Sequence, residues 1–134
     1  MCGIFGFVAT QDAQLIAADL RSILAKFFKL SEKRGREAAG LALMCGSSVD
    51  VFKRPGQAHE MARSDDYLTF VNQFIARVSE PNQTGTQLPP LIAIGHSRLV
   101  TNGAESVTRN NQPVISKYSV GIHNGIVVND DELW

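Results

Sequence analysis

The chain has 134 residues, enough for one domain with a hydrophobic core. Apolar residues make up 44% and charged residues 19% of it, and 13 basic residues balance 13 acidic ones, which is typical of a globular protein. This balance gives no electrostatic reason to expect a nucleic acid or an anionic membrane as partner. Two cysteines are too few for a disulfide scaffold.

The N-terminus lacks the basic leader and long apolar run of a secretory signal, and no apolar run approaches the roughly 20 residues of a membrane helix. The sequence therefore predicts a cytoplasmic protein. In chain order, residues 2–9 are expected to form a short buried strand. Residues 12–30 predict a helix, because apolar residues recur at three- and four-residue spacing. Thr10 or Asp12 is expected to cap the start of this helix. Residues 31–40 are expected to form a loop.

The middle of the chain predicts a hairpin followed by a second helix. Residues 41–45 and 49–54 are typical of paired strands that are joined through a short glycine and serine turn. Residues 64–80 predict a helix, since their apolar side chains fall on one face.

The last third predicts strands separated by polar turns. A polar loop over 81–90 precedes a strand over 91–100, and residues 118–128 predict a strand, a turn and another apolar run. Asn129 and Glu132 have the spacing of a helix capping box. Because the sequence ends where this helix begins, we expect the chain to be part of something longer.

Three polar islands interrupt the apolar strands: "RGREAAG" over 34–40, "GHSRLVTNG" over 95–103 and "HNG" over 123–125. Loops at strand ends on a rigid scaffold often carry function. Each island also has an ordinary structural explanation, since Asn-Gly is a hairpin signal and an arginine near a glutamate is commonly a solvated pair. The functional interpretation depends on all three islands sharing one chain with a terminal cysteine.

Cys2 directly follows the initiator methionine, which is normally trimmed before a small residue. Cys2 would then carry both its thiol and the α-amine, whose ordinary pKa is about 7.7–8.0. Such an amine can take the thiol's proton and so generate the nucleophilic thiolate. Gly3 is expected to leave room for a substrate and to allow unusual backbone angles.

An acyl-transfer nucleophile also needs donors for an oxyanion. The side-chain amide of Asn124 and the backbone N–H of Gly125 are candidates for this oxyanion hole. Arg98 is a candidate for binding a substrate carboxylate with two parallel hydrogen bonds.

The motifs "CGIFGF", "RGREAAG", "GHSRLVTNG" and "HNGIVVN" occur in the order found in class II glutamine amidotransferases, which are N-terminal nucleophile hydrolases. The resemblance spans nearly the whole chain, and it implies that residues 1–134 form the N-terminal part of a longer glutamine amidotransferase type 2 domain. It implies an α+β fold of four αββα layers, with two antiparallel sheets between helices, incomplete at the C-terminus.

The resemblance implies specific roles for several residues. Cys2 matches the nucleophile that attacks the glutamine side-chain amide, and Asn124 and Gly125 match the oxyanion donors. Arg98 matches the arginine that binds the α-carboxylate, and Thr101 matches a threonine lining the same pocket.

Further residues of these islands match parts that surround the substrate. His123 and Gly125 are expected to approach the substrate's amino end. Arg34 and Glu37 match a loop behind the nucleophile and are expected to support the site.

Some positions depart from the phosphosugar-type members of the family. Leu99 stands where an aromatic residue is common, and Asn102 where a histidine is common. Gln112 stands at a position before proline that is often a histidine. In this respect the chain is more like the phosphoribosyl-type members. The family aspartate that binds the substrate's α-amine comes after further sequence beyond the third island, and Asp130 and Asp131 follow that island too closely to match it.

The implied reaction is hydrolysis of L-glutamine to glutamate and ammonia through a γ-glutamyl thioester. It needs no cofactor and no metal, and the three histidines do not have the spacing of a zinc site. The ammonia would pass to a synthase domain or subunit outside this chain, and a homodimer remains open.

Three alternatives are weighed against this interpretation. The first is a terminal-cysteine hydrolase that acts on another amide. The second is a catalytically inactive regulatory domain with the same fold, and the third is an unrelated binding domain whose islands are coincidental turns. The glutamine assignment depends on Arg98, and the other two alternatives predict an unreactive Cys2.

Overall fold

The computed structural model describes residues 1–79, 87–99 and 106–125. These residues form six strands, three α-helices and three short 3-10 turns, which cover Gln11–Ala13, Glu32–Arg34 and Thr108–Asn110. In chain order the strands and helices are β1 (Gly3–Ala9), α1 (Ala17–Ser31), β2 (Ala38–Cys45), β3 (Ser48–Pro55), α2 (Ala58–Met61), α3 (Asp65–Val78), β4 (Leu91–Arg98), β5 (Val114–Ile115) and β6 (Val120–Gly121).

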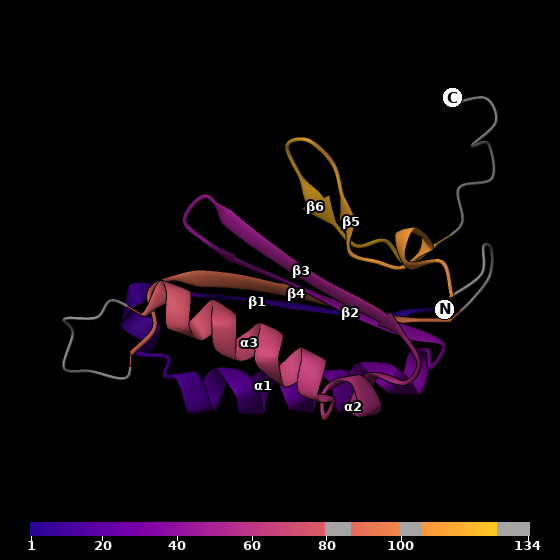
Figure 1. Ribbon diagram of the computed structural model, residues 1–134, viewed down its shortest axis with the longest axis horizontal. Coiled ribbons are helices and arrows are strands. Elements are labelled where there is room, and N and C mark those ends of the chain that lie inside the picture. The colour runs from indigo at the N-terminus through magenta and orange to yellow at the C-terminus, as the bar shows by residue number, and fades with distance from the viewer. Residues whose placement is uncertain (80–86, 100–105, 126–134) are drawn as a thin grey trace.

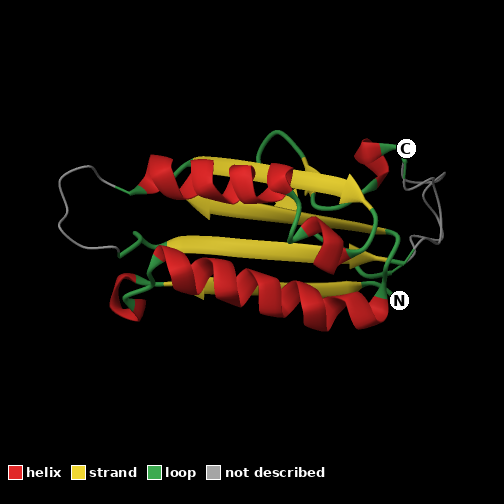
Figure 2. Cartoon of the chain, turned by 60° about the horizontal axis from the view of Figure 1, so that its bottom comes forward, coloured by secondary structure: helices red, strands yellow, loops and turns green. Residues whose placement is uncertain are grey.

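Four strands form one antiparallel sheet in the order β1-β4-β2-β3, so β1 is an edge strand among the residues that the structure describes. Helices α1 and α3 cover one face of this sheet, and the β5–β6 hairpin lies on the other side (Figures 1 and 2). The expected α+β class is confirmed. The remaining layers of the four-layer arrangement stay a prediction.

The core lies between the sheet and the helices because alternate strand residues are apolar on that face. Phe5 stacks with Phe27 and meets the edge of Phe28, both on α1. Gly95, opposite Phe5 in the β1–β4 register, makes room for the ring, since a Cβ there would lie 2.1 Å from it. The largest fully buried apolar side chains are Leu20, Leu24, Phe28, Leu41, Leu43, Met61, Val71, Phe74 and Leu91.

The first helix begins later than its periodicity predicts. It starts at Ala17, with Ile16 at the N-cap and no capping side chain, so the predicted caps at Thr10 and Asp12 are wrong. The backbone before it is engaged elsewhere: Leu15 O accepts a hydrogen bond from Leu88 N at 2.6 Å. Pairing with the segment before β4 therefore replaces the first helical turn.

Among the other predicted elements, the hairpin of β2 and β3, the second helix and the strand β4 are confirmed. The first strand forms, but the expectation that it is buried is wrong, since Ile4 and Val8 are exposed. Of the strand expected within residues 118–128, β6 covers Val120–Gly121. Residues 31–40, predicted as a loop, instead contain the end of α1, a 3-10 turn and the first residues of β2. Most of the predicted 81–90 loop and the predicted capping box at Asn129 lie outside the described residues.

Candidate functional site

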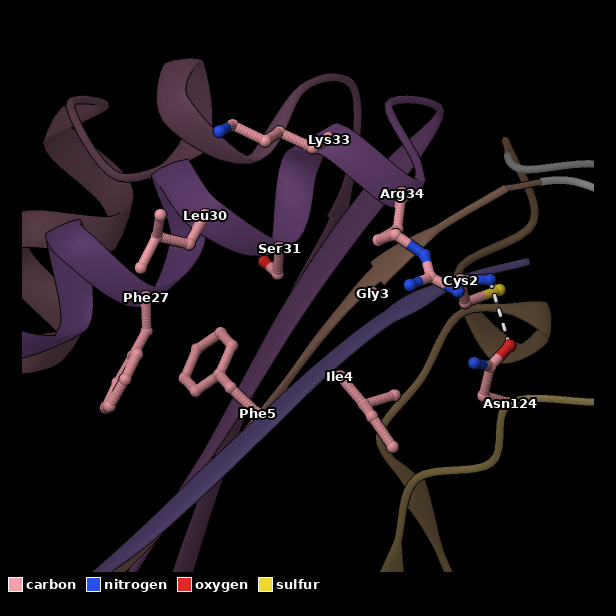
Figure 3. A pocket seen from close by; sticks show the side chains of 10 residues that line it. All are labelled: Cys2, Gly3, Ile4, Phe5, Phe27, Leu30, Ser31, Lys33, Arg34 and Asn124. Carbon is pink, nitrogen blue, oxygen red and sulfur yellow. Dashed lines mark hydrogen bonds between the residues drawn. The ribbon is translucent and has the colours of Figure 1, made fainter.

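Cys2 stands immediately before β1, at the end of the edge strand (Figure 3). Its Sγ lies 3.4 Å from Leu99 N, which donates to it, and 3.6 Å from Leu99 O. Leu99 directly follows β4, the strand that pairs with β1 through Gly3 and Ser97. The sheet register therefore fixes the thiol beside the end of β4.

Asn124 lies against the backbone of Cys2, although the two residues are far apart in sequence. Its Oδ1 accepts a hydrogen bond from Cys2 N at 2.9 Å (Figure 3). In this structure Met1 is present, so Cys2 N is a peptide nitrogen. Because the amide oxygen faces Cys2 N, the amide hydrogens on Nδ2 are directed away from that nitrogen.

A pocket of about 480 Å³ runs along β1 and the C-terminal half of α1, with Cys2 and Asn124 among its lining (Figure 3). Its floor is apolar, from residues such as Phe5 and Leu30, and Lys33 and Arg34 bring positive charge to it. The pocket thus combines a thiol, an amide and cationic groups with an apolar wall.

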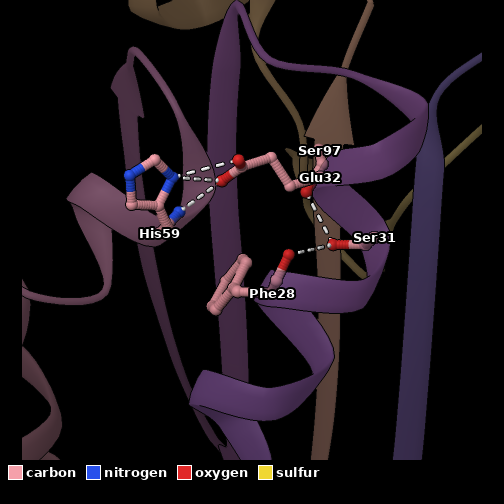
Figure 4. A network of polar contacts seen from close by, with 5 residues as sticks. All are labelled: Phe28, Ser31, Glu32, His59 and Ser97. Atoms are coloured by element: carbon pink, nitrogen blue, oxygen red, sulfur yellow. Dashed lines mark hydrogen bonds and ion pairs between the residues drawn. The ribbon is translucent and has the colours of Figure 1, made fainter.

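Gly3 lines this pocket, and it is also packed closely against the end of α1. A Cβ at this position would lie 2.2 Å from Ser31 O, so the space beside Gly3 is occupied by the end of α1. Its φ is not in the left-handed region, and the expectation of unusual backbone angles is wrong. The hydroxyls of Ser31 and Ser97 are 2.7 Å apart, which ties the same end of α1 to β4 (Figure 4).

Arg98 does not line this pocket. It ends β4 and is only 6% exposed, on the sheet face opposite the helices, since the neighbouring Ser97 faces α1. Its Nη1 donates to Asn111 Oδ1 at 2.7 Å. The carboxylate-binding role that the resemblance implies therefore remains a prediction.

The first island lies across the end of β4. Glu37 N donates to Arg98 O at 3.1 Å, and a Cβ at Gly35 would lie 2.4 Å from the carbonyl carbon of Arg98. Arg34 lines the pocket, and its Nη2 lies 3.8 Å from Met1 Sδ. Glu37 thus supports Arg98 through its backbone, whereas Arg34 lies on the Cys2 side.

The third island, residues 123–125, is exposed and lies beside Cys2 at the start of β1. His123 and Gly125 lie together, because a Cβ on Gly125 would come within 2.9 Å of the His123 ring. Thr101 lies outside the described residues, so its predicted place in the pocket stays untested.

His96, two residues before Arg98 on the same face, is fully buried. Its ring lies near the backbone of His123, yet neither ring nitrogen makes a hydrogen bond of ordinary geometry. Burial and the charge of Arg98 lower the pKa of His96 to about 4. The ring is therefore neutral at physiological pH.

Sequence reasoning gave no role to Asn111 and Gln112, which the structure places between the second and third islands. Gln112 Nε2 donates to His123 O at 3.0 Å, and His123 N donates to Gln112 Oε1. The cluster of amide side chains before a proline was the available signal, but amides are also common in turns.

A second polar contact that the sequence did not indicate joins α1 to α2. Glu32 accepts hydrogen bonds from His59 N at 2.7 Å and from the His59 ring at 2.8 Å (Figure 4). Burial acts to raise the pKa of Glu32, but these hydrogen bonds and the charges of His59 and Arg36 outweigh it and lower the pKa. Neither Glu32 nor His59 lines the pocket beside Cys2.

Relatives with known names match nearly the whole chain. A glutamine–fructose-6-phosphate aminotransferase (isomerizing) of Geobacillus kaustophilus is 29% identical over 96% of this chain and 17% of its own length. The enzyme of the same name from Halalkalibacterium halodurans is 29% identical over 99% of this chain and 18% of its own length. An amidophosphoribosyltransferase of Methanocaldococcus jannaschii is 31% identical over 99% of this chain and 24% of its own length.

Over nearly its whole length this chain is thus similar to part of enzymes of the glutamine amidotransferase group. No protein-family model matches it. The chain spans about a fifth of the length of the relatives, between 17% and 24%. In the described part of this amidotransferase-like chain, no helix is long and apolar enough to cross a membrane. Over the same residues, no three side chains of metal-binding type gather together.

Proposed function

We propose that this chain is the glutaminase part of a glutamine amidotransferase, with Cys2 as its N-terminal nucleophile. The observation that carries the proposal is the hydrogen bond from Cys2 N to Asn124 Oδ1, which joins the thiol-bearing chain end to the candidate oxyanion loop. The relation to glutamine-utilising enzymes supports glutamine as substrate. Removal of Met1 would convert Cys2 N into the α-amine that the reaction needs.

In the proposed reaction the α-amine takes the thiol proton, and Cys2 Sγ forms a bond to the carbonyl carbon of the glutamine side chain. Asn124 Nδ2 and the N–H of Gly125 donate hydrogen bonds to the carbonyl oxygen and stabilise its negative charge. Losing one such donor typically costs about 2.7–4 kcal/mol of transition-state stabilisation. The α-ammonium returns its proton to the departing nitrogen, so ammonia leaves and a γ-glutamyl thioester remains. Water then cleaves the thioester to glutamate and regenerates the thiol.

The surroundings of the thiol suit this chemistry. Leu99 N–H faces Cys2 Sγ, where the negative charge of a thiolate resides. Asn124 Oδ1 orients the nitrogen that becomes the amine, and the same contact directs Nδ2 toward other partners. The ammonia acceptor is a synthase domain or subunit beyond this chain, in keeping with the larger size of the relatives. We place the reaction in the cytoplasm.

Labelling with 6-diazo-5-oxo-L-norleucine, an electrophilic glutamine analogue, tests the proposal. We expect one adduct on Cys2 in protein that has lost Met1, and none on Cys45, which supplies the internal control. Cys45→Ala should label like the wild type, and Cys2→Ala should not label. Retention of Met1, or equal labelling of the two thiols, would contradict an N-terminal nucleophile.

One observation favours a second candidate, a terminal-cysteine hydrolase of another amide. Arg98 is engaged by Asn111 and lies outside the pocket, whereas Arg34 lines it beside Cys2. If glutamine is the substrate, Arg98→Ala should raise its KM far more than it lowers kcat. An unchanged KM in Arg98→Ala would reject Arg98 as the carboxylate ligand, and if Arg34→Ala also leaves KM unchanged, another amide is the substrate.

A further inference from the structure

The segment of Asn111 and Gln112 is held firmly on the sheet face opposite the helices. Lys53 Nζ, on β3, donates to Asn111 O at 2.9 Å. Gln112 O lies directly over β2 at Gly40, where a Cβ would come within 2.0 Å of it. Since two strands of the sheet fix its backbone, this segment can act as a rigid support for whatever its side chains hold.

The side chain of Gln112 holds the backbone of the third island. Its amide makes two hydrogen bonds to His123, one given to the carbonyl oxygen at 3.0 Å and one accepted from the N–H. This pairing fixes both polar groups of one residue, much as a neighbouring strand does. Asn124 comes next in the chain, and its Oδ1 contacts Cys2 N.

The side chain of Asn111 holds the second island. Its Oδ1 accepts from Arg98 Nη1 at 2.7 Å, and Asn111 is only 1% exposed. Two consecutive side chains thus contact two different islands: Asn111 binds the guanidinium of Arg98, and Gln112 binds the peptide before Asn124.

We propose that Asn111 and Gln112 are positioning residues that set where the carboxylate-binding Arg98 lies relative to the oxyanion donors of Asn124 and Gly125. This inference rests on the proposed glutaminase function. Neither residue touches the substrate. Asn111 acts on substrate binding through Arg98, and Gln112 acts on the chemical step through the 123–125 loop.

The two roles predict opposite kinetic effects in glutamine hydrolysis. Asn111→Ala should raise the KM for glutamine about tenfold and change kcat by less than about threefold. Gln112→Ala should lower kcat about 10- to 100-fold with KM within about threefold, because misplacing a catalytic group by about 1 Å can cost 100-fold in rate. Gln73→Ala, an exposed glutamine on α3, is the matched control and should behave as the wild type. Equal effects of the two variants on both constants would refute the division of roles.

Gln112→Glu separates positioning from general destabilisation. An ionised carboxylate accepts from His123 N–H but has no proton to give to His123 O, whereas a protonated carboxyl restores both hydrogen bonds. With an ordinary carboxyl pKa of about 4.3, this group becomes substantially protonated only near pH 4.5, so the ratio of the kcat of this variant to that of the wild type should rise about fourfold or more between pH 8 and pH 4.5. Gln73→Glu should show no such rise. A constant ratio for Gln112→Glu would contradict the proposal.

Amide hydrogen exchange tests the contact without any activity. His123 N–H donates to Gln112 Oε1, so its exchange should be slow in the wild type and at least about tenfold faster in Gln112→Ala. Unchanged exchange in that variant would overturn the inference even if the enzyme is active. Slow exchange that depends on Gln112, in a protein that does not hydrolyse glutamine, would refute the proposed function and the kinetic roles while retaining the contact.

Discussion

Acidification is expected to destabilise the folded chain through His96, and the structure sets the size of the effect. The ring is fully buried on the sheet face that carries Arg98. Burial and the nearby guanidinium lower its pKa to about 4 from an ordinary value of 6.5. Protonation in the folded state would place an imidazolium next to a cation with no water to solvate it.

The sign follows from the number of protons that each state binds. Between about pH 6.5 and pH 4 the unfolded chain has a protonated His96 and the folded chain a neutral one, so the free energy of unfolding decreases as the pH falls. Above this window His96 causes no pH dependence, and below it the loss is complete. Linkage gives a loss of about 2 kcal/mol at pH 5 and about 3 kcal/mol once the folded pKa is passed.

Urea unfolding of the wild type and of His96→Gln at several pH values measures this effect. The variant carries a neutral side chain at all pH values, so its stability should fall less between pH 8 and pH 5, by about 2 kcal/mol. Comparing the two pH profiles cancels the other titrating groups, which both proteins share. Parallel profiles would refute the reasoning, because they would mean that the folded state accommodates the charged ring.

Three further changes test other contacts. Phe28→Ala should lower the free energy of unfolding by about 3–5 kcal/mol in urea denaturation, because the ring is fully buried, and a loss below about 1 kcal/mol would contradict its place in the core. Gly40→Ala should cost about 1–3 kcal/mol and speed amide exchange at His123, because its Cβ would strike Gln112 O. Glu32→Gln should cost about 1 kcal/mol at pH 7. Since the pKa of Glu32 is lowered, this difference should be retained at the ordinary pKa of a carboxyl group and shrink only as the pH falls further, which thermal melts over a series of acidic pH values would show.

Local patterns in the sequence were sufficient to predict most of the fold. Short apolar runs predicted β1 and β4, and the placement of apolar side chains on one face predicted α3, because burial of apolar side chains dominates these elements. The start of α1 was not predictable in this way. There the backbone of Leu15 pairs with Leu88, a residue that is distant in sequence, and this contact outweighs the local helical preference.

The candidate site was predictable as a set of residue types but not as an arrangement. The sequence indicated Cys2 and Asn124 separately, and only the fold shows that Asn124 contacts the nitrogen of Cys2. The sequence indicated Arg98 as a residue that binds the substrate carboxylate. It could not show that Nη1 of Arg98 donates a hydrogen bond to Asn111. Contacts of this kind depend on where loops meet after folding, and one sequence carries no local signal for them.

The edge position of β1 also has a consequence for the timing of synthesis. Among the described strands β1 pairs only with β4, and Gly3 lies opposite Ser97. A ribosome adds roughly 5–20 residues per second, so it needs roughly 5–20 seconds to synthesise the residues between β1 and the end of β4. Throughout that interval β1 has no β4 to pair with. Cys2 contacts Leu99 and Asn124 only afterwards, so the candidate site forms late in the synthesis of the chain.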